Sequence, residues 1–277
     1  EGPWPLLVFS HCHECTRFSS FTMAEHLASH GFVVAAPDHE GNTLFDSLGD
    51  DPLDLDTDTL DIRLGDMQAT LDAMLTDQGP SLLRGVLDPN RVGVLGHSFG
   101  SVTAGLTLQE DGRPSAALGI AAPMENPLLA GVEVAGISDP LMFLVAEEDN
   151  SITEVGNELM RDNYDDAGGP AWKLEVADAG HWSFSDIVGL DEPYMPGCGD
   201  DTRQTDGEAC NTGTGNPVAR ASGQCARPAR PNARTSSPDV SRPSSGIMRH
   251  RLSQISPGLQ RFWATALYSR ATQTEPP

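Results

Sequence analysis

Lysine is almost absent from this chain of 277 residues, because Lys173 is the single one. Lysine and arginine together number 17 against 40 aspartates and glutamates, which gives a formal net charge of −23. A nucleic acid or an anionic membrane surface binds proteins through clustered basic side chains, so this balance argues against both as partners. The sequence also lacks any run of eighteen or more apolar residues, and we therefore expect no membrane-spanning segment.

Cysteine is scarce as well, and the five present are Cys12, Cys15, Cys198, Cys210 and Cys225. Their odd number and irregular spacing do not match a zinc-finger framework, and they allow at most two disulfides. The sequence leaves open whether Cys198 and Cys210 close a small loop, which would be typical of an exported protein. We expect a secreted or periplasmic protein. The chain opens on Glu1 and enters an apolar run within five residues, which we interpret as a processed or truncated beginning with no signal peptide left to read.

Charge and composition divide the chain near Pro217. Residues 1–216 hold 8 basic and 38 acidic residues, whereas residues 217–277 hold 9 basic and 2 acidic ones. The second part is rich in Ser, Pro and Arg and buries too little apolar surface to fold by itself. We therefore expect one folded domain over 1–216 and a largely disordered basic tail over 217–277. The stretch "SPGLQRFWATALYSRA" has helix-start residues and helically spaced apolar residues, which predict a terminal helix near 257–271.

Six short apolar runs alternate with helical patterns along residues 1–216. The runs are mostly continuous and rich in Val, Leu, Ile or Phe, as expected of strands covered on both faces. Strand and helix in alternation predict an α/β fold: a mostly parallel central sheet with helices on both faces. The expected strands are Leu6–Ser10, Phe32–Ala36, Arg91–Leu95, Ala117–Ala122, Leu141–Ala146 and Trp172–Ala177. The helical stripes comprise Phe18, Phe21, Ala24 and Leu27, closed by Gly31, and Leu64, Met67, Leu71 and Leu75.

Alternating aspartates occupy "DDPLDLDTDTLD", residues 50–61. Such carboxylates are the ligands that calcium prefers, but the stretch lacks the glycine and the final glutamate of an EF-hand loop. We interpret it as a solvated loop that caps the following helix.

The sequence "GHSFG", residues 96–100, lies between a predicted strand and a helical stretch. Gly-x-Ser-x-Gly alone is a weak signal. At a strand-to-helix junction it is typical of a nucleophile elbow, where small residues relieve backbone crowding and the serine is presented at the start of the helix. We predict Ser98 as a nucleophile, with a purely structural turn as the alternative.

A serine hydroxyl becomes a nucleophile when a base takes its proton and an acid orients that base. Asp149 follows the strand "LMFLVA", with Glu148 beside it as the alternative acid, and a solvated acidic loop is the other interpretation. His181 follows the next strand, whereas His97 is expected to point away from Ser98. The carboxyl ends of parallel strands share one edge of a sheet, so we expect Ser98, Asp149 and His181 to form a catalytic triad there.

Three segments in order, "FSHCHECTRFSSFTMAEHLASHGFVVAAPDHEGNT", "RVGVLGHSFGS" and "AGHWSFSD", resemble the α/β-hydrolase superfamily. The resemblance is to serine esterases similar to dienelactone hydrolase and platelet-activating-factor acetylhydrolase, and it covers about residues 4–215. "FLVAEEDNSI" also resembles cutinase-like polyester hydrolases. The resemblance implies an α/β-hydrolase fold whose first one or two edge strands are missing. A true dienelactone hydrolase would carry cysteine at position 98, so that activity is not expected.

The resemblance further implies an oxyanion hole made by the backbone N–H groups of His13 and Phe99. Two such donors stabilise the charge that grows on a carbonyl oxygen. Cys12 and Cys15 stand where the family usually has glycine, and a Cβ there narrows the loop or forbids a positive φ. We therefore expect an altered oxyanion loop.

Two other interpretations of "HCHEC", residues 11–15, compete with the oxyanion loop. A redox pair matches the Cys-x-x-Cys spacing, but thioredoxin-type pairs open a helix in a different strand context. A zinc site needs more ligands than five consecutive residues can direct at one ion, unless a distant residue contributes. We favour the oxyanion loop.

These patterns together predict a serine carboxylic ester hydrolase that forms an acyl-enzyme on short acyl esters or on polyesters. We expect it to use no cofactor or metal, to have a small-molecule or polymeric ester as its partner, and to be a monomer. Trp182, next to His181, is a candidate for the substrate pocket. The alternatives are a catalytically impaired relic or binding protein, indicated by Cys12, Cys15 and the unusual tail, and a peptidase with the same triad.

Overall fold

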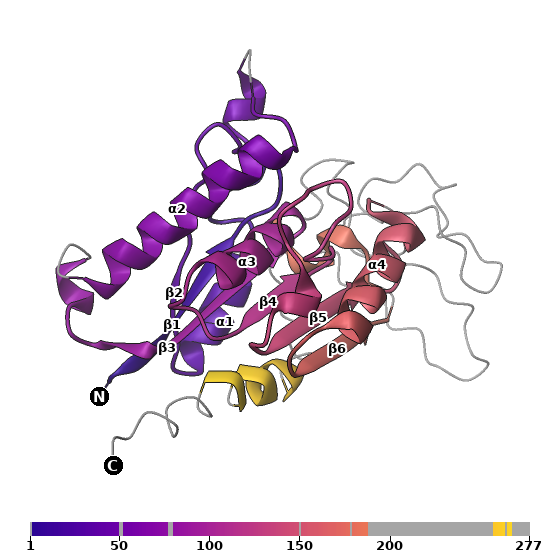
Figure 1. Ribbon diagram of the computed structural model, residues 1–277. Coiled ribbons are helices and arrows are strands. Elements are labelled where there is room, and N and C mark those ends of the chain that lie inside the picture. Colours follow the sequence, from indigo (N-terminus) through magenta and orange to yellow (C-terminus); the bar gives the residue numbers. More distant parts are fainter. Residues whose placement is uncertain are drawn as a thin grey trace, which may run out of the picture.

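The computed structural model describes residues 2–49, 52–76, 80–149, 151–177, 179–187, 257–263 and 265–267. Six parallel strands form one sheet in this part of the chain (Figure 1). All six predicted runs are strands, with boundaries that differ from the prediction by a few residues. Their bounds are β1 Trp4–Ser10, β2 Val33–Ala35, β3 Leu87–His97, β4 Ala117–Ile120, β5 Leu141–Ala146 and β6 Ala171–Val176.

The strand order is β2-β1-β3-β4-β5-β6. From β1 the chain moves outward to β2, crosses back to β3 on the other side of β1, and then continues to β6. The order therefore reverses between β1 and β3, which pair directly, with Val8 opposite Val94. In open parallel sheets, ligands bind beyond the carboxyl ends of the strands at such a reversal. Ser10 and His97, the last residues of β1 and β3, mark that position.

Apolar residues fill both faces of the sheet. Along β1, Leu6 and Val8 belong to one core cluster and Leu7 and Phe9 to the other, because successive side chains of a strand point to opposite faces. The first face is covered by α2 (Thr57–Leu75), α3 (Phe99–Glu110) and α4 (Thr153–Asp166). The second is covered by α1 (Phe21–Ser29) and a helical segment near the end of the chain (Figure 1). Burial on both faces explains the continuous apolar runs.

The buried face of α1 differs from the predicted stripe. Its buried residues are Thr22, Met23 and Leu27. Phe21 is 41% exposed and Phe18 67% exposed, so the two aromatic residues of the stripe face outward. The helix begins only at Phe21, and Phe18 therefore lies in the preceding turn, outside the helical periodicity. The predicted end is confirmed, since Gly31 has a φ of +89° directly after the helix.

Residues 257–263 and 265–267 are helical and pack on the sheet (Figure 1). The residues buried there are Leu259, Phe262, Trp263, Ala266 and Leu267. A Cβ at Gly93 of β3 would come within 2.5 Å of the Trp263 ring, so this helix lies directly on the strand. The predicted boundary at Pro217, most of the tail, and Cys198, Cys210 and Cys225 lie outside the described residues.

The aspartate-rich stretch leads into α2. Asp56 is its N-cap, and its carboxylate accepts a hydrogen bond of 2.8 Å from the N–H of Thr59. The expected capping role is therefore confirmed for Asp56. Neither α2 nor another helix in the described part of the chain is long and apolar enough to cross a membrane.

Candidate active site

Ser98 stands on a tight turn between β3 and α3. Its φ of +58° and ψ of −123° lie in a region that residues with a Cβ rarely adopt, as at a nucleophile elbow. A Cβ at Gly96 would collide with the backbone of Gly100, and a Cβ at Gly100 would collide with the carbonyl of Ser10. Both glycines are therefore required by close backbone approach, and the second contact places the end of β1 against the elbow.

Asp149 and His181 are in direct contact beyond the ends of β5 and β6. His181 Nδ1 lies 2.7 Å from Asp149 Oδ2, and both side chains are buried. The other oxygen, Asp149 Oδ1, accepts hydrogen bonds from the N–H groups of Ser151 at 2.9 Å and Ile152 at 3.1 Å. Asp149 is thus the acid that contacts His181, and Glu148, the alternative acid, is buried beside it. A carboxylate held in this way fixes the imidazole tautomer with Nε2 free to accept a proton.

The link between Ser98 and this pair that the structure shows is made by His97, the residue before Ser98. The described residues show no hydrogen bond between Ser98 Oγ and His181. His97, the last residue of β3 and the neighbour of Ser98 in the chain, contacts His181: its Nε2 donates to the carbonyl of His181 at 2.9 Å, and the two ring centroids are 5.0 Å apart. Catalytic hydrogen bonds are often long in the absence of substrate, so the missing bond between Ser98 and His181 does not argue against a catalytic role for Ser98.

His97 is uncharged at neutral pH. Its side chain is fully buried, and this burial, together with the nearby His181, lowers the pKa of His97 to about 3. Among the described residues its Nδ1 has no hydrogen-bond partner. The expectation that His97 points away from Ser98 is compatible with this contact, but sequence reasoning missed its bond to the His181 backbone.

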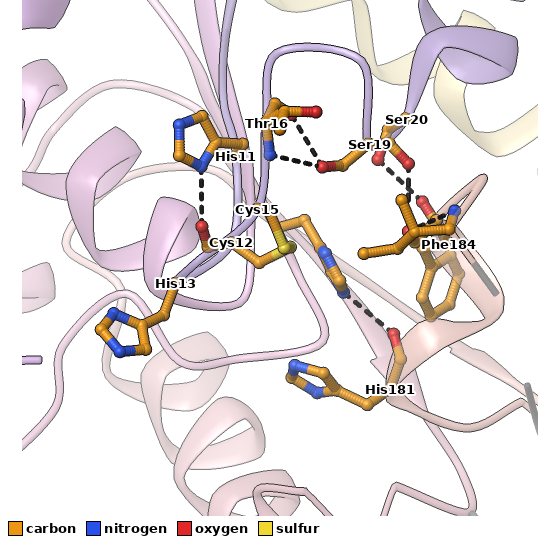
Figure 2. The surroundings of a disulfide bond; sticks show 12 residues. His11, Cys12, His13, Cys15, Thr16, Ser19, Ser20, His181 and Phe184 are labelled. Carbon is orange, nitrogen blue, oxygen red and sulfur yellow. Dashed lines mark hydrogen bonds between the residues drawn. A yellow bond between two sulfur atoms is a disulfide. The ribbon is translucent and has the colours of Figure 1, made fainter. Parts of the chain in front are cut away.

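A disulfide joins Cys12 and Cys15 in the loop that follows β1 (Figure 2). Both residues are about 1% exposed, and the N–H of Cys15 also bonds to the carbonyl of Cys12 at 3.3 Å. Glu14, between them, has a φ of +52°, so the bridge closes a sharp turn. The sequence analysis favoured an altered oxyanion loop over a cysteine pair, and the structure adds to it that Cys12 and Cys15 are bonded to each other. The Cys-x-x-Cys spacing was the signal, and it indicates a structural bridge here.

The bridged loop lies next to the elbow. The rings of His13 and Phe99 are 6.1 Å apart, and His13 Nδ1 accepts a hydrogen bond of 2.8 Å from the Asn42 amide. Phe99 is the first residue of α3, and its N–H has no partner within the helix. The two residues predicted to supply oxyanion donors are thus neighbours at the carboxyl end of β1 and β3.

A second set of bonds ties the chain after the disulfide to the chain after His181 (Figure 2). Ser20 Oγ donates to the carbonyl of Phe184 at 3.0 Å, and Thr22 N–H donates to the Asp186 carboxylate at 2.8 Å. Ser185 Oγ donates to the carbonyl of Ser19 at 3.0 Å. The sequence showed no sign of these contacts, because the partners are more than 160 residues apart.

Trp182, the predicted pocket residue, is half-buried beside His181. Its ring centroid lies 4.9 Å from that of His181 and 5.8 Å from that of His97, edge-on in both cases. Within the described residues, no group of three or more His, Cys, Asp and Glu side chains is placed to hold a metal ion.

Comparison with known proteins shows similarity to a family model and to solved structures. The model of the family described as platelet-activating factor acetylhydrolase, isoform II, matches residues 1–49. A solved structure of ferulic acid esterase from Streptomyces cinnamoneus is similar over 99% of this chain and 71% of its own, at 23% sequence identity and a TM-score of 0.60. The search of curated proteins finds no significant match. The structural likeness shows that the chain has the α/β-hydrolase fold, and both similarities agree with the resemblance to esterases of that superfamily.

Proposed function

We propose that this protein is a serine carboxylic ester hydrolase. The observation that carries the proposal is the buried contact between Asp149 and His181, at the same sheet edge as Ser98 on its strained turn. A carboxylate and a histidine held together at the sheet edge that also carries the half-buried Ser98 are the parts that nucleophilic acyl transfer needs. The resemblance to esterases of the α/β-hydrolase superfamily supports the same reaction class.

In the proposed mechanism, Ser98 Oγ attacks the ester carbonyl carbon while His181 Nε2 takes the hydroxyl proton. The tetrahedral oxyanion accepts hydrogen bonds from the N–H groups of His13 and Phe99. When the C–O bond of the ester breaks, the leaving alcohol takes the proton from His181. Water then attacks the acyl-enzyme, gives a proton to His181, and releases the acid, and Ser98 recovers its proton. Asp149 holds His181 throughout and stabilises the imidazolium.

The proposed substrates are short acyl esters, with polyesters as the polymeric case. Trp182, edge-on to His181, supports an apolar wall on which an acyl or aromatic group packs. The protein is proposed to act as a monomer without a cofactor. The buried disulfide supports an oxidising location, secreted or periplasmic, because cytosolic thiols are kept reduced.

Hydrolysis of p-nitrophenyl acetate and p-nitrophenyl octanoate tests the proposal. We expect saturable turnover that is unchanged by chelator and that falls by about 10⁴-fold or more in Ser98→Ala. The ratio of kcat/KM for the two esters ranks acyl length, and a matched p-nitroanilide distinguishes esterase from peptidase. A folded wild-type protein without turnover would instead support the impaired relic or binding protein.

A further inference from the structure

Arg63 of α2 is a buried charge that forms no direct ion pair, and the nearby Asp66 carboxylate acts on it only at longer range. Its side chain is fully buried, and the described residues hold no ion pair to its guanidinium. Burial lowers the pKa of Arg63 to about 9, which still leaves the group charged at neutral pH. A buried charge without an ionic partner is costly, and proteins place such groups where they are needed for function or are fully hydrogen-bonded.

Neutral acceptors satisfy this guanidinium. Arg63 Nε donates to Thr103 Oγ1 at 3.0 Å, and Nη1 donates to Asn42 Oδ1 at 2.6 Å. Nη2 donates to Ser10 Oγ at 3.0 Å and also to the carbonyl of His11. Because every partner is uncharged, the positive charge is held in place without being neutralised.

These contacts reach both halves of the proposed oxyanion hole. The His11 carbonyl belongs to the peptide just before Cys12, and Asn42 links Arg63 to the His13 ring through its own amide. On the other side, the guanidinium lies 4.5 Å from the centre of the Phe99 ring, as in a cation–π contact. One side chain thus contacts the segment of each predicted donor.

The histidines around Arg63 are uncharged at neutral pH, so the guanidinium is the one positive charge in this group of side chains. Burial lowers the pKa of His11 to about 3 and the pKa of His39 well below its ordinary value, with the Arg63 charge as the next cause in both. His39 lies between Ser10 Oγ, 2.9 Å from Nε2, and the Asp66 carboxylate, 2.9 Å from Nδ1. Asp66 therefore accepts a hydrogen bond from Nδ1 of the neutral His39 and does not bond to Arg63 directly. The Ser10 hydroxyl donates to His39 Nε2, which leaves its oxygen free to accept the guanidinium N–H.

We propose that Arg63 is a positioning residue for the oxyanion hole, which fixes the His13 loop and Phe99 in the geometry that receives the oxyanion. The proposal rests on the esterase function proposed above. A loosely held N–H donor stabilises the charged oxyanion of the transition state less well, whereas it changes the binding of the neutral ester little. The effect of Arg63 should therefore appear in kcat rather than in KM.

The test compares Arg63→Met and Arg63→Lys with Arg113→Met as a matched control. Arg113 lies in the chain beyond α3 and pairs with Asp72 of α2 and with Asp111 at the end of α3. Neither partner belongs to the candidate site. We expect Arg63→Met to lower kcat about 100-fold with KM changed less than threefold, and to weaken a boronic-acid transition-state analogue in the same proportion. Arg63→Lys should recover part of the loss, because it keeps the charge but reaches fewer acceptors. Arg113→Met should keep kcat within twofold.

Folded Arg63→Met protein that retains kcat and analogue affinity within threefold overturns the proposal and leaves Arg63 a structural role only. If Arg63→Met does not fold, Asn42→Ala decides, because it leaves the guanidinium in place and disconnects His13. We expect about a tenfold fall in kcat at constant KM, and unchanged kcat overturns the proposal. Absence of turnover in the wild-type protein would count against the esterase itself, before any Arg63 variant is compared.

Discussion

The two sides of the site are held by different means. On the side of β1, a disulfide and a buried guanidinium hold the loop that carries His13. On the side of β5 and β6, hydrogen bonds hold the acid and the base: the one between them, two from backbone N–H groups to Asp149, and one from His97 to the carbonyl of His181. The difference follows from what each side must place. On the side of β5 and β6 the groups to be placed are side chains, which bond to each other, whereas the side of β1 must place a backbone N–H in an irregular loop, and that loop carries added crosslinks.

The largest expected effect tests the acid–base side. Asp149→Asn keeps the size of the side chain but no longer fixes the His181 tautomer, so we expect kcat to fall about 10⁴-fold. The measurement is steady-state hydrolysis of p-nitrophenyl acetate, with circular dichroism as the control for folding. Glu148→Gln is the matched variant, and a larger loss in it than in Asp149→Asn would mean that the neighbouring carboxylate is the acid.

The next effect tests the β1 side. Replacing both bridged cysteines, Cys12→Ser with Cys15→Ser, removes a crosslink across a four-residue turn, which loop-closure entropy values at about 2 kcal/mol of unfolding free energy. We also expect about a tenfold fall in kcat, because the turn that carries His13 loosens. Urea unfolding and ester hydrolysis measure the two effects. Full activity in the destabilised variant would show that the bridge serves stability alone.

A pH effect sharpens the comparison, because buried neutral histidines lie on both sides, with His97 against His181 and with His11 and His39 beside the β1 loop. Burial lowers the pKa of His97 and of His11 to about 3, from an ordinary value of 6.5. The unfolded chain therefore binds more protons than the folded protein between pH 6.5 and 3. The contribution of each histidine to the free energy of unfolding is fully present above pH 6.5. It falls by about 1.4 kcal/mol per pH unit as the pH drops from 6.5 toward 3.

Urea unfolding at several pH values from 7.5 to 4.5 measures this slope. We expect His97→Asn and His11→Asn each to reduce it by one proton. An unchanged slope in either variant would mean that the histidine concerned is protonated in the folded state.

The smallest effect concerns an exposed ion pair on the β1 side. The Arg17 guanidinium contacts Asp38, but its side chain is 50% exposed. Such pairs contribute about 0–1 kcal/mol, so Arg17→Ala should lower the unfolding free energy by no more than this and leave kcat unchanged. A loss of activity would show that the outer surface of the loop also fixes the site. Thermal unfolding and ester hydrolysis are the measurements.

The sequence predicted the sheet well because buried parallel strands have a simple signature. The run "LMFLVA" is apolar at every position, and β5 spans it without a shift. The elbow was equally readable, since Gly96 and Gly100 are required by close backbone contacts on either side of Ser98. Local chemistry therefore predicted the fold and the candidate nucleophile.

The contacts that hold the β1 loop, those of Arg63 and of Ser20, were harder to predict from the sequence. Arginine on a helix usually faces solvent, and Arg63 carried no mark except its position, three residues after Leu60 and four before Met67, both buried. That spacing places it on the buried face of α2 and was the available signal. The bonds of Ser20 to Phe184 join distant segments and leave no local pattern. Aromatic side chains misled at α1, where Phe18 precedes the helix.

The helical segment at residues 257–263 and 265–267 has a consequence for how the protein is made. Leu7 and Phe9 of β1 lie on the face that this helix covers, and Trp263 packs against β3, the strand that ends at the elbow. During synthesis these strands leave the ribosome long before the helix does. The part of their apolar face that α1 does not cover therefore stays exposed until late in translation, and we expect the nascent chain to offer a binding surface to chaperones during that time.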